Sequence, residues 1–238
     1  MTIAMVTQRL QVARRTKLYD LLAASPLIAW YAICVAHMLP QVSRQVALVR
    51  LFFQTDPFAT PVGLLLSTSA HISTMVFFGV LVVMFAVRHV PQQIGTYIYA
   101  RCVAVAGTLL GIGIVLLPPQ ELSSTVYLIS LILILTGTVI AIWASLTLGR
   151  SISILPQARR LVTRGPYAFV RHPLYLGEIV AIIGVALQYL SIWAILLAGL
   201  QCALQLQRMG YEERILRQVF PEYGDYARRT ARLIPRVY

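Results

Sequence analysis

The chain has 238 residues, of which 58% are hydrophobic and only 12% are charged, and its mean hydropathy is +0.76. This composition excludes an ordinary soluble domain and indicates an integral membrane protein. The net charge of +12 comes almost entirely from arginines that lie between apolar runs, so we expect membrane lipids rather than nucleic acid as partners. The three cysteines lie far apart in apolar runs and predict neither a disulfide framework nor a metal site.

The first apolar run, Leu21 to Leu39, follows a polar and basic segment at residues 1–19. It is too long for the apolar part of a signal peptide and ends without a clear cleavage site, so it predicts a transmembrane helix. The connection that follows contains Val46 to Phe53. This stretch is apolar enough to lie in the membrane interface as a short amphipathic piece of a connection that covers residues 40–61.

The second predicted span, Val62 to Val87, carries a polar patch around His71. A histidine inside the membrane is a candidate functional residue. Hydroxyl groups and a neutral imidazole also form ordinary hydrogen bonds between helices, however. We favour this second interpretation for His71.

Two further spans are predicted, at roughly Ile98 to Leu117 and at Thr125 to Leu148. The first of them contains Gly107 and Gly111 in a GxxxG pattern, which favours close helix packing. Together with the preceding spans they form a predicted N-terminal transmembrane region of residues 1–148.

The segment from Leu161 to Gly177, LVTRGPYAFVRHPLYLG, interrupts the apolar runs. Its prolines and glycines exclude one continuous helix. An ordered loop with arginine, histidine and tyrosine at the mouth of a membrane bundle is a candidate functional site, because loops on rigid scaffolds often carry chemistry. The alternative is a basic loop that only sets topology, and that alternative does not explain the tyrosines and the histidine.

After this loop, the chain is apolar from Leu174 to Leu206. A straight helix of about 33 residues would be about 50 Å long, whereas the hydrocarbon core is about 30 Å thick. We therefore predict a helical hairpin that turns near residues 188–191. Glu178 is the only acid inside any of the apolar runs and lies close to the loop.

The last segment, Arg208 to Tyr238, is rich in arginines, acids and aromatic residues. Its pattern predicts an amphipathic cytoplasmic helix, a turn at Pro221 and a second short helix. Arg208 and Glu212 are four residues apart and therefore share a helix face. They form either a surface ion pair that contributes little or an anchor for a zwitterionic group at the membrane border.

The positive charges also predict the orientation of the chain in the membrane. With six spans and a cytoplasmic N-terminus, every basic residue except Arg44 and Arg50 lies on the cytoplasmic side. We predict an all-α multi-pass protein of the cell membrane with about six transmembrane helices, a helical hairpin and a C-terminal cytoplasmic amphipathic helix. Both termini are cytoplasmic in this arrangement, and the central loop and the C-terminal segment are on one side, where they can meet.

The central loop, the hairpin and the segment GYEERILRQVFPEYGDY together resemble the isoprenylcysteine carboxyl methyltransferase family. They are also similar to the related phospholipid N-methyltransferases and small-thiol S-methyltransferases. The resemblance covers about residues 145–230, within a predicted catalytic region of residues 149–238. It implies that the loop and the C-terminal segment enclose S-adenosylmethionine on the cytosolic side.

Carried over by matching position, the resemblance implies a catalytic acceptor site and a cofactor pocket. The acceptor site is expected at Arg208 and Glu212. The cofactor pocket is expected at Arg159, Arg160, Leu161, Val162, Tyr167, His172, Pro173, Leu174, Tyr175 and Glu213. The two neighbouring arginines and a shorter spacing from Phe220 to Tyr223 depart from the eukaryotic lipid-modifying members, so the acceptor stays open.

The residue types suit methyl transfer from a sulfonium, an in-line displacement in which positioning and exclusion of water supply most of the catalysis. We predict methylation of a membrane-partitioned or small apolar acceptor, which is an isoprenylcysteine-like carboxylate, a lipid amine or a thiol. One alternative is a sterol-reductase-like membrane enzyme that uses NADPH. The other is a protein of membrane transport or assembly, although the sequence has no inverted repeat that would favour transport.

Overall fold

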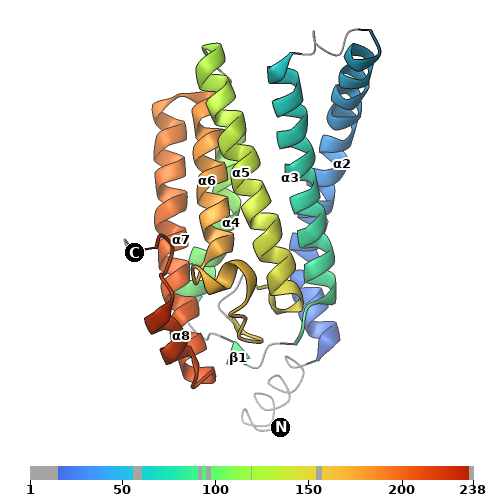
Figure 1. Cartoon of the computed structure of the whole chain (residues 1–238). Coiled ribbons are helices and arrows are strands. Elements are labelled where there is room, and N and C mark those ends of the chain that lie inside the picture. The colour runs from blue at the N-terminus through green and yellow to red at the C-terminus, as the bar shows by residue number, and fades with distance from the viewer. Residues whose placement is uncertain are drawn as a thin grey trace.

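Six long helices make up most of the chain that the computed structural model describes, which is residues 16–55, 61–90, 93–94, 98–118, 120–153 and 157–235. The helices run roughly side by side (Figure 1). They are α2 (Lys17–Thr55), α3 (Val62–Val87), α4 (Ile98–Val115), α5 (Ser124–Leu148), α6 (Pro173–Tyr189) and α7 (Ile192–Val219). The shorter elements are β1 (Gln93–Ile94), η2 (Gly149–Ser151), β2 (Gln157–Ala158), η3 (Gly165–Ala168) and α8 (Tyr223–Arg229).

The helical membrane architecture expected from the sequence is confirmed. Three described segments are long and apolar enough to cross a membrane, namely Asp20–Thr55, Val62–Val87 and Ser124–Ser151, and Pro173–Tyr189 is a shorter apolar helix. Helices α3, α4 and α5 begin and end within two residues of the predicted spans. The total of six spans stays a prediction.

The prediction that a connection begins at residue 40, with a short amphipathic piece at Val46–Phe53, is wrong. Helix α2 is continuous over 39 residues and includes both Pro26 and Pro40. A proline removes only its own N–H from the helix, and hydroxyl side chains and packing neighbours can compensate for that loss within a membrane. At about 58 Å, α2 is nearly twice as long as the hydrocarbon core is thick, about 30 Å. Residues 40–45 continue the helix without a break, so Pro40 does not end it.

The predicted hairpin is confirmed at Leu190 and Ser191. Leu190 has a φ of 34°, in the left-handed region that ends a helix. The Ser191 side chain then caps the next helix by accepting a hydrogen bond of 3.2 Å from the backbone N–H of Ala194. Together these two residues reverse the chain between α6 and α7.

Helix α7 differs from the prediction at its C-terminal half. It continues without a break from the apolar hairpin through Arg208 to Val219, so the amphipathic segment is an extension of the last apolar helix rather than a separate element. A turn at Pro221 and the short helix α8 follow, as predicted. The continuity matters because it holds Arg208 and Glu212 rigidly in line with the apolar interior.

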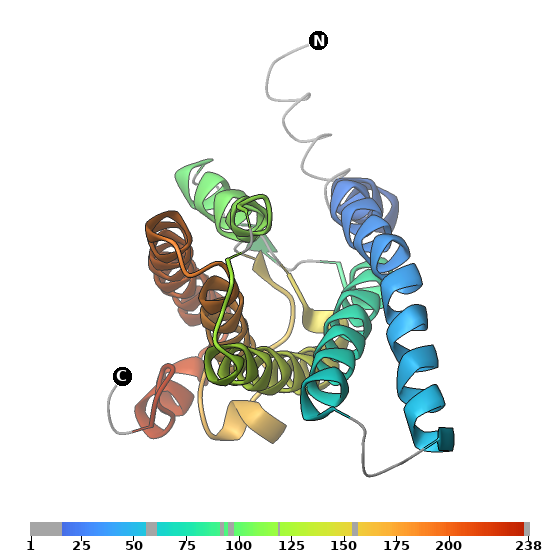
Figure 2. The same cartoon turned by 90° about the horizontal axis from the view of Figure 1, so that it is seen from above.

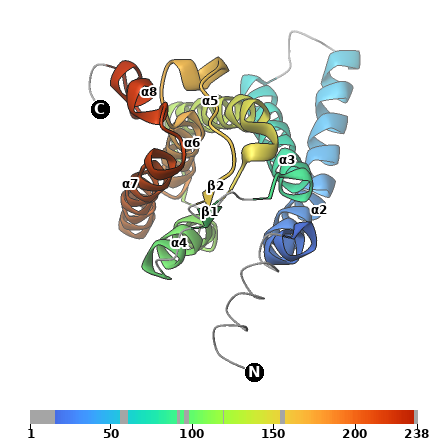
Figure 3. The ribbon, with the colours of Figure 1, turned by 90° about the horizontal axis from the view of Figure 1, so that it is seen from below.

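The long helices form a ring when viewed along their axes (Figure 2). Neighbouring helices pack in the order α2, α3, α5, α6, α7 and α4. Among the described residues, α2 and α4 share no extensive contact, and the ring is open on this side in Figures 2 and 3. Helices α2 and α4 are thus the two ends of the ring.

Glycines allow the closest pair in the ring, α5 and α6, to approach each other. A Cβ atom added at Gly137 would lie 2.5 Å from the carbonyl oxygen of Gly177, and one added at Gly177 would lie 2.6 Å from that of Gly137. A Cβ at Gly184 would lie 2.7 Å from the carbonyl oxygen of Ser130. Small residues at such contacts are typical of helix pairs in membranes, and this pair supports the first turns of α6.

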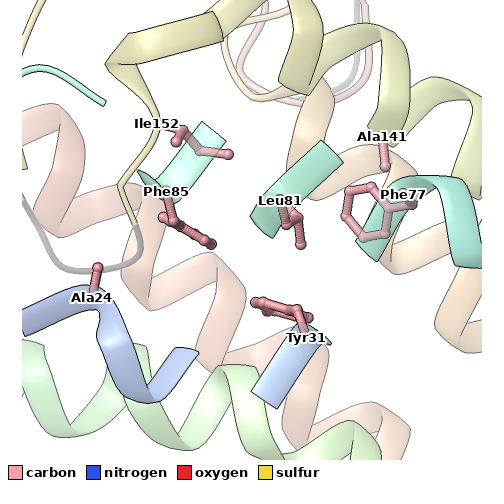
Figure 4. Close-up of a cluster of buried hydrophobic side chains, with 7 residues drawn as sticks. All are labelled: Ala24, Tyr31, Phe77, Leu81, Phe85, Ala141 and Ile152. Atoms are coloured by element: carbon pink, nitrogen blue, oxygen red, sulfur yellow. The ribbon is translucent and has the colours of Figure 1, made fainter. Parts of the chain in front are cut away.

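Aromatic packing joins α2 and α3 to the rest of the bundle (Figure 4). Tyr31 of α2 stacks on Phe85 of α3, with ring centroids 6.2 Å apart. The cluster also contains Ala24, Phe77, Leu81, Ala141 of α5 and Ile152 of the segment that follows α5. The N-terminal helices are thereby fixed against the segment that leads into the candidate site.

Candidate active site

The described parts of the central loop, residues 149–153 and 157–172, lie at one end of the bundle, which is called the loop end below (Figure 3). Strand β2 of this loop pairs antiparallel with β1, which follows α3. Farther along, Gly165 has a φ of 60°, in the left-handed region that favours glycine. It starts the short helix η3, which places Tyr167 in a buried position. Local turn chemistry thus orders the loop before His172 is reached.

The segment after α7, residues 220–235, is called the tail and is bound directly to the central loop. The backbone N–H of Arg171 donates to the carbonyl oxygen of Ala231 at 2.8 Å, and that of His172 donates to Arg232 at 3.1 Å. The Tyr226 hydroxyl donates to the carbonyl oxygen of Tyr167 at 2.7 Å. The expectation that these two segments meet is therefore confirmed.

Glu213 of α7 connects the loop, the helix and the tail. Its Oε1 atom lies 3.0 Å from Nε2 of His172, 3.2 Å from Nε of Arg232 and 3.5 Å from Nη1 of Arg171. Burial alone would raise the pKa of Glu213, but the His172 ring and the two guanidinium groups outweigh burial and hold the pKa below its usual range. Glu213 therefore fixes the orientation of the His172 ring.

One cavity of about 900 Å³ extends from the loop end into the apolar interior of the ring. It is lined by all of the predicted site residues except Pro173 and Glu213, that is by Arg159, Arg160, Leu161, Val162, Tyr167, His172, Leu174, Tyr175, Arg208 and Glu212. Pro173 instead occupies the first turn of α6, where its missing N–H is not needed. The central loop and α7, about fifty residues apart in sequence, thus line the same cavity.

Arg208, Tyr175 and Glu212 form a compact group on the wall of this cavity. The guanidinium carbon of the buried Arg208 lies 5.0 Å from the centre of the Tyr175 ring, a cation–π contact. The Tyr175 hydroxyl donates a hydrogen bond to Glu212 Oε1. Burial raises the pKa of Glu212, and the attraction of Arg208 and His172 opposes this rise only in part. The group is therefore not an exposed surface ion pair.

Arg159 lines the cavity, but its guanidinium group forms an ion pair with Asp20. The sequence analysis did not identify Asp20 as a candidate residue. Asp20 Oδ1 lies 2.8 Å from Nη2 of Arg159, and Asp20 Oδ2 lies 2.8 Å from Nε of Arg88. All three residues are buried. The cluster connects the start of α2, the central loop and the end of α3. The signal for it in the sequence was Asp20, an acidic residue in the first turn of a mostly apolar helix.

A second group that the site prediction omitted lies deeper in the cavity. Glu178 of α6 accepts a hydrogen bond of 2.9 Å from Nε2 of Gln205 of α7. Gln201, one turn farther along α7, donates to the carbonyl oxygen of Gly107. All three polar side chains line the cavity. Polar residues at helical spacing inside an apolar run are a signal that could have identified them.

His71 lies at the far end of the same cavity. Its Nδ1 atom is 3.1 Å from Oε1 of Gln45 on α2, and the nearby Ser73 hydroxyl is 2.7 Å from that of Thr138 on α5. These are the interhelical hydrogen bonds that we favoured from the sequence. Within the part of the chain that the structure describes, no group of three or more His, Cys, Asp or Glu side chains is arranged to hold a metal ion.

Comparison with known proteins matches the C-terminal part of the chain. Residues 125–223 match the model of the phospholipid methyltransferase family. A nickel-cobalt-cadmium resistance protein, NccN, of Alcaligenes xylosoxydans xylosoxydans is 33% identical over 118 residues, which are 49% of this chain and 53% of that protein. A cobalt-zinc-cadmium resistance protein, CzcN, of Cupriavidus metallidurans is 38% identical over 78 residues, 32% of this chain and 36% of that protein.

A plant relative carries a methyltransferase name. Protein-S-isoprenylcysteine O-methyltransferase B of Arabidopsis thaliana is 34% identical over 112 residues, which are 44% of this chain and 57% of that protein. The chain thus aligns with between about a third and somewhat more than half of the length of these relatives. The matched region contains the central loop, the hairpin and the Arg208–Glu212 helix, and in this region the chain is similar to isoprenylcysteine carboxyl methyltransferases and to the phospholipid methyltransferase family.

Proposed function

We propose that this protein is an integral membrane methyltransferase that transfers a methyl group from S-adenosylmethionine to a lipophilic or small apolar acceptor. The observation that carries the proposal is a cavity that joins polar side chains under the central loop to the apolar interior of the ring. A water-soluble methyl donor and a membrane-dissolved acceptor can meet only in a space with both properties.

The residues that line this cavity fit S-adenosylmethionine by their chemistry. Its carboxylate suits the guanidinium groups of Arg160 and Arg171. Its adenine suits the aromatic rings of Tyr167 and Tyr226, and all four residues line the cavity. When bound, S-adenosylmethionine supplies a methyl group on a positively charged sulfur.

The chain's own contribution is to position the reactants and exclude water. The tail closes the central loop from outside through its backbone hydrogen bonds to Arg171 and His172. Tyr175 holds the Glu212 carboxylate on one side and contacts the Arg208 guanidinium on the other. A polar group of the acceptor that reaches this point is therefore met by prearranged charges.

We place the access of the acceptor on the open side of the ring, between α2 and α4 (Figure 2). Residues of both helices line the cavity there, including Trp30 and Cys34 of α2 and Gly111 of α4. In the proposed topology the chain spans the cell membrane six times, with the loop end and both termini on the cytoplasmic side. The names of these relatives do not agree on an acceptor, since one names isoprenylcysteine and two refer only to metal resistance.

Binding of the methyl donor tests the proposal. Detergent-purified protein is titrated calorimetrically with S-adenosylmethionine and, separately, with NADPH. We expect saturable binding of S-adenosylmethionine that His172→Ala weakens at least about tenfold, or 1.4 kcal/mol, and Leu200→Ala leaves unchanged, because Leu200 faces the outside of α7. Saturable binding of NADPH without binding of S-adenosylmethionine would support the reductase alternative and overturn the proposal.

A further inference from the structure

A polar stripe runs along α7 inside the apolar bundle. Gln201, Gln205, Arg208 and Glu212 are spaced by four, three and four residues, which places them on one face of a helix. All four line the cavity, whereas apolar residues such as Leu196 on other faces of α7 are exposed. The stripe extends from the Arg208–Glu212 group toward the middle of the bundle.

The hydrogen bonds of the two glutamines fix the direction of their amide groups. Nε2 of Gln205 donates to the Glu178 carboxylate, and Nε2 of Gln201 donates to the carbonyl oxygen of Gly107. A carboxylate and a carbonyl oxygen only accept hydrogen bonds, so the amide nitrogen must face them in both cases. The Oε1 atom of each glutamine is therefore directed elsewhere.

Both Oε1 atoms are buried and lack a hydrogen-bond partner among the described residues. The residues themselves are only 7% (Gln201) and 1% (Gln205) exposed. Buried polar atoms of this kind are normally satisfied, because leaving one unpaired costs free energy. Two unsatisfied acceptors on the wall of a cavity indicate a ligand that brings donors.

The acidic side chain beside the two amides has the same preference. Glu178 lies five residues, or about 8 Å, along α6 from its first residue, and its carboxyl oxygen already accepts the Gln205 amide. The Arg208 guanidinium is attracted by both Glu178 and Glu212. A carboxylate that entered beside Glu178 would meet another acidic group and two amide oxygens, and an amide oxygen cannot donate a hydrogen bond.

We propose that Glu178, Gln201 and Gln205 bind the head group of the acceptor, and that this head group is a primary or secondary amine on a lipophilic molecule. An ammonium or amine supplies two or three N–H donors to one carboxylate and two amide oxygens, whereas a hydroxyl or thiol supplies one and a carboxylate none. The inference rests on the proposed function for the role of the amine as methyl acceptor. It selects one of the three acceptor classes that the sequence leaves open.

Binding of three matched amphiphiles tests the subsite without a methyl donor. The probes are dodecylamine, dodecanol and dodecanoate, titrated near neutral pH into protein in a non-ionic detergent. We expect dodecylamine to bind at least about tenfold more tightly than dodecanoate. The chain as a whole carries a charge of +12, so unspecific attraction favours the anion, and a preference for the amine reports the local subsite.

Two variants test which residues cause the preference for the amine. Glu178→Gln keeps an acceptor for the Gln205 amide but removes the charge, and Gln205→Leu removes the amide. We expect each to weaken dodecylamine binding about tenfold while S-adenosylmethionine binding is retained. The control is Glu121→Gln, which removes a carboxylate from an exposed position outside the cavity and should leave all three probe affinities unchanged.

The outcomes separate this inference from the proposed function. Equal or tighter binding of dodecanoate by the unmodified protein overturns the inference, even if the variants do not fold. Transfer of a labelled methyl group to dodecanoate in preference to dodecylamine also overturns it, while it supports methyl transfer. Failure to bind S-adenosylmethionine overturns the proposed function, whereas amine selectivity measured without that cofactor still supports the subsite.

Discussion

At the scale of single residues, the site depends on which side chains contact each other, and not only on which residue types are present. Arg208 contacts the Tyr175 ring, and Tyr175 donates to Glu212. Glu213 directly follows Glu212 in the sequence, yet Glu213 contacts His172 whereas Glu212 contacts Tyr175. Two neighbouring glutamates therefore have different roles, because a step of one residue along a helix turns the side chain by about 100°.

The first prediction concerns Arg208 and Glu212. We expect Arg208→Ala and Glu212→Gln each to abolish most methyl transfer, because removal of one member leaves the other charge buried, at a cost of roughly 3–5 kcal/mol. Arg208→Lys should restore only part of the activity, because a point charge does not replace a bidentate fork. Turnover and S-adenosylmethionine affinity are measured on the same folded variants, and near-normal turnover in both would remove this pair from the active site.

At the scale of elements, the candidate site is assembled by α6, which carries His172 at its N-terminal boundary and Tyr175 and Glu178 on its first turns. The position of α6 is set by its contact with α5 through Gly137 and Gly177. The opposite wall is α7 and the tail. The site therefore responds to changes in helix packing as well as to changes in its own side chains.

The second prediction concerns that packing. Gly137→Ala and Gly177→Ala place a Cβ atom against backbone atoms that cannot move independently, so we expect each to destabilise the bundle by about 1–3 kcal/mol. Gly79→Ala in α3 is the control, since a Cβ there meets nothing within 4 Å. Thermal unfolding in one detergent compares the three variants. Equal stability of all three would show that the α5–α6 contact is not the constraint described above.

The third prediction concerns the pH dependence of the contact between tail and loop. The pKa of Glu213 is lower in the folded protein than its ordinary value, so ionisation of Glu213 favours folding. This stabilisation is complete above the unfolded pKa, about 4.3, and is lost as the pH falls through the lower pKa of the folded state. We expect acidification to loosen the tail, which hydrogen exchange of residues 223–235 at stepped pH would detect.

Glu213→Gln should loosen the tail already at neutral pH and should show a weaker pH dependence. The expected cost is about 1.5–3 kcal/mol, the value of a hydrogen bond to a charged group. Asp225→Asn is the matched control, because Asp225 forms an exposed ion pair with Arg228 that is worth about 0–1 kcal/mol. Identical exchange in the two variants would argue against a special role for Glu213.

At the scale of the whole molecule, the ring places all long helices around one cavity and leaves one side open (Figure 2). The loop end gathers the central loop, β1, β2 and the tail (Figure 3). The buried Asp20–Arg88–Arg159 cluster links this end to α2 and α3. The N-terminal helices are thus part of the wall of the site, although the family match covers only residues 125–223.

The fourth prediction concerns orientation in the membrane. Because nearly all basic residues lie at the loop end or in the segments attached to it, we expect this end to face the cytoplasm. In a chain without its native cysteines, Thr163→Cys should react with an impermeant thiol reagent only after the membrane is opened, and Glu121→Cys should react in intact cells. Labelling of Thr163→Cys from outside would contradict both the topology and the access of a cytosolic methyl donor.

The sequence by itself determined the features that depend on local composition. Apolar runs identified α3, α4 and α5, and the length of the apolar run from Leu174 to Leu206 predicted the break that Leu190 and Ser191 provide. The residues from Leu161 to Tyr175, together with Arg208 and Glu212, marked the region that lines the cavity at the loop end. These patterns are readable because hydropathy and turn chemistry act over a few neighbouring residues.

The tertiary structure alone decided which distant residues meet. Arg159 is paired with Asp20, 139 residues away, and Glu213 of α7 binds His172, which lies 41 residues earlier. Glu178, Gln201 and Gln205 become one polar group only after the hairpin folds. The separation of sequence and structure has a physical reason: helix formation is governed by neighbours within one or two turns, whereas burial, charge pairing and the shape of a cavity depend on how whole helices pack.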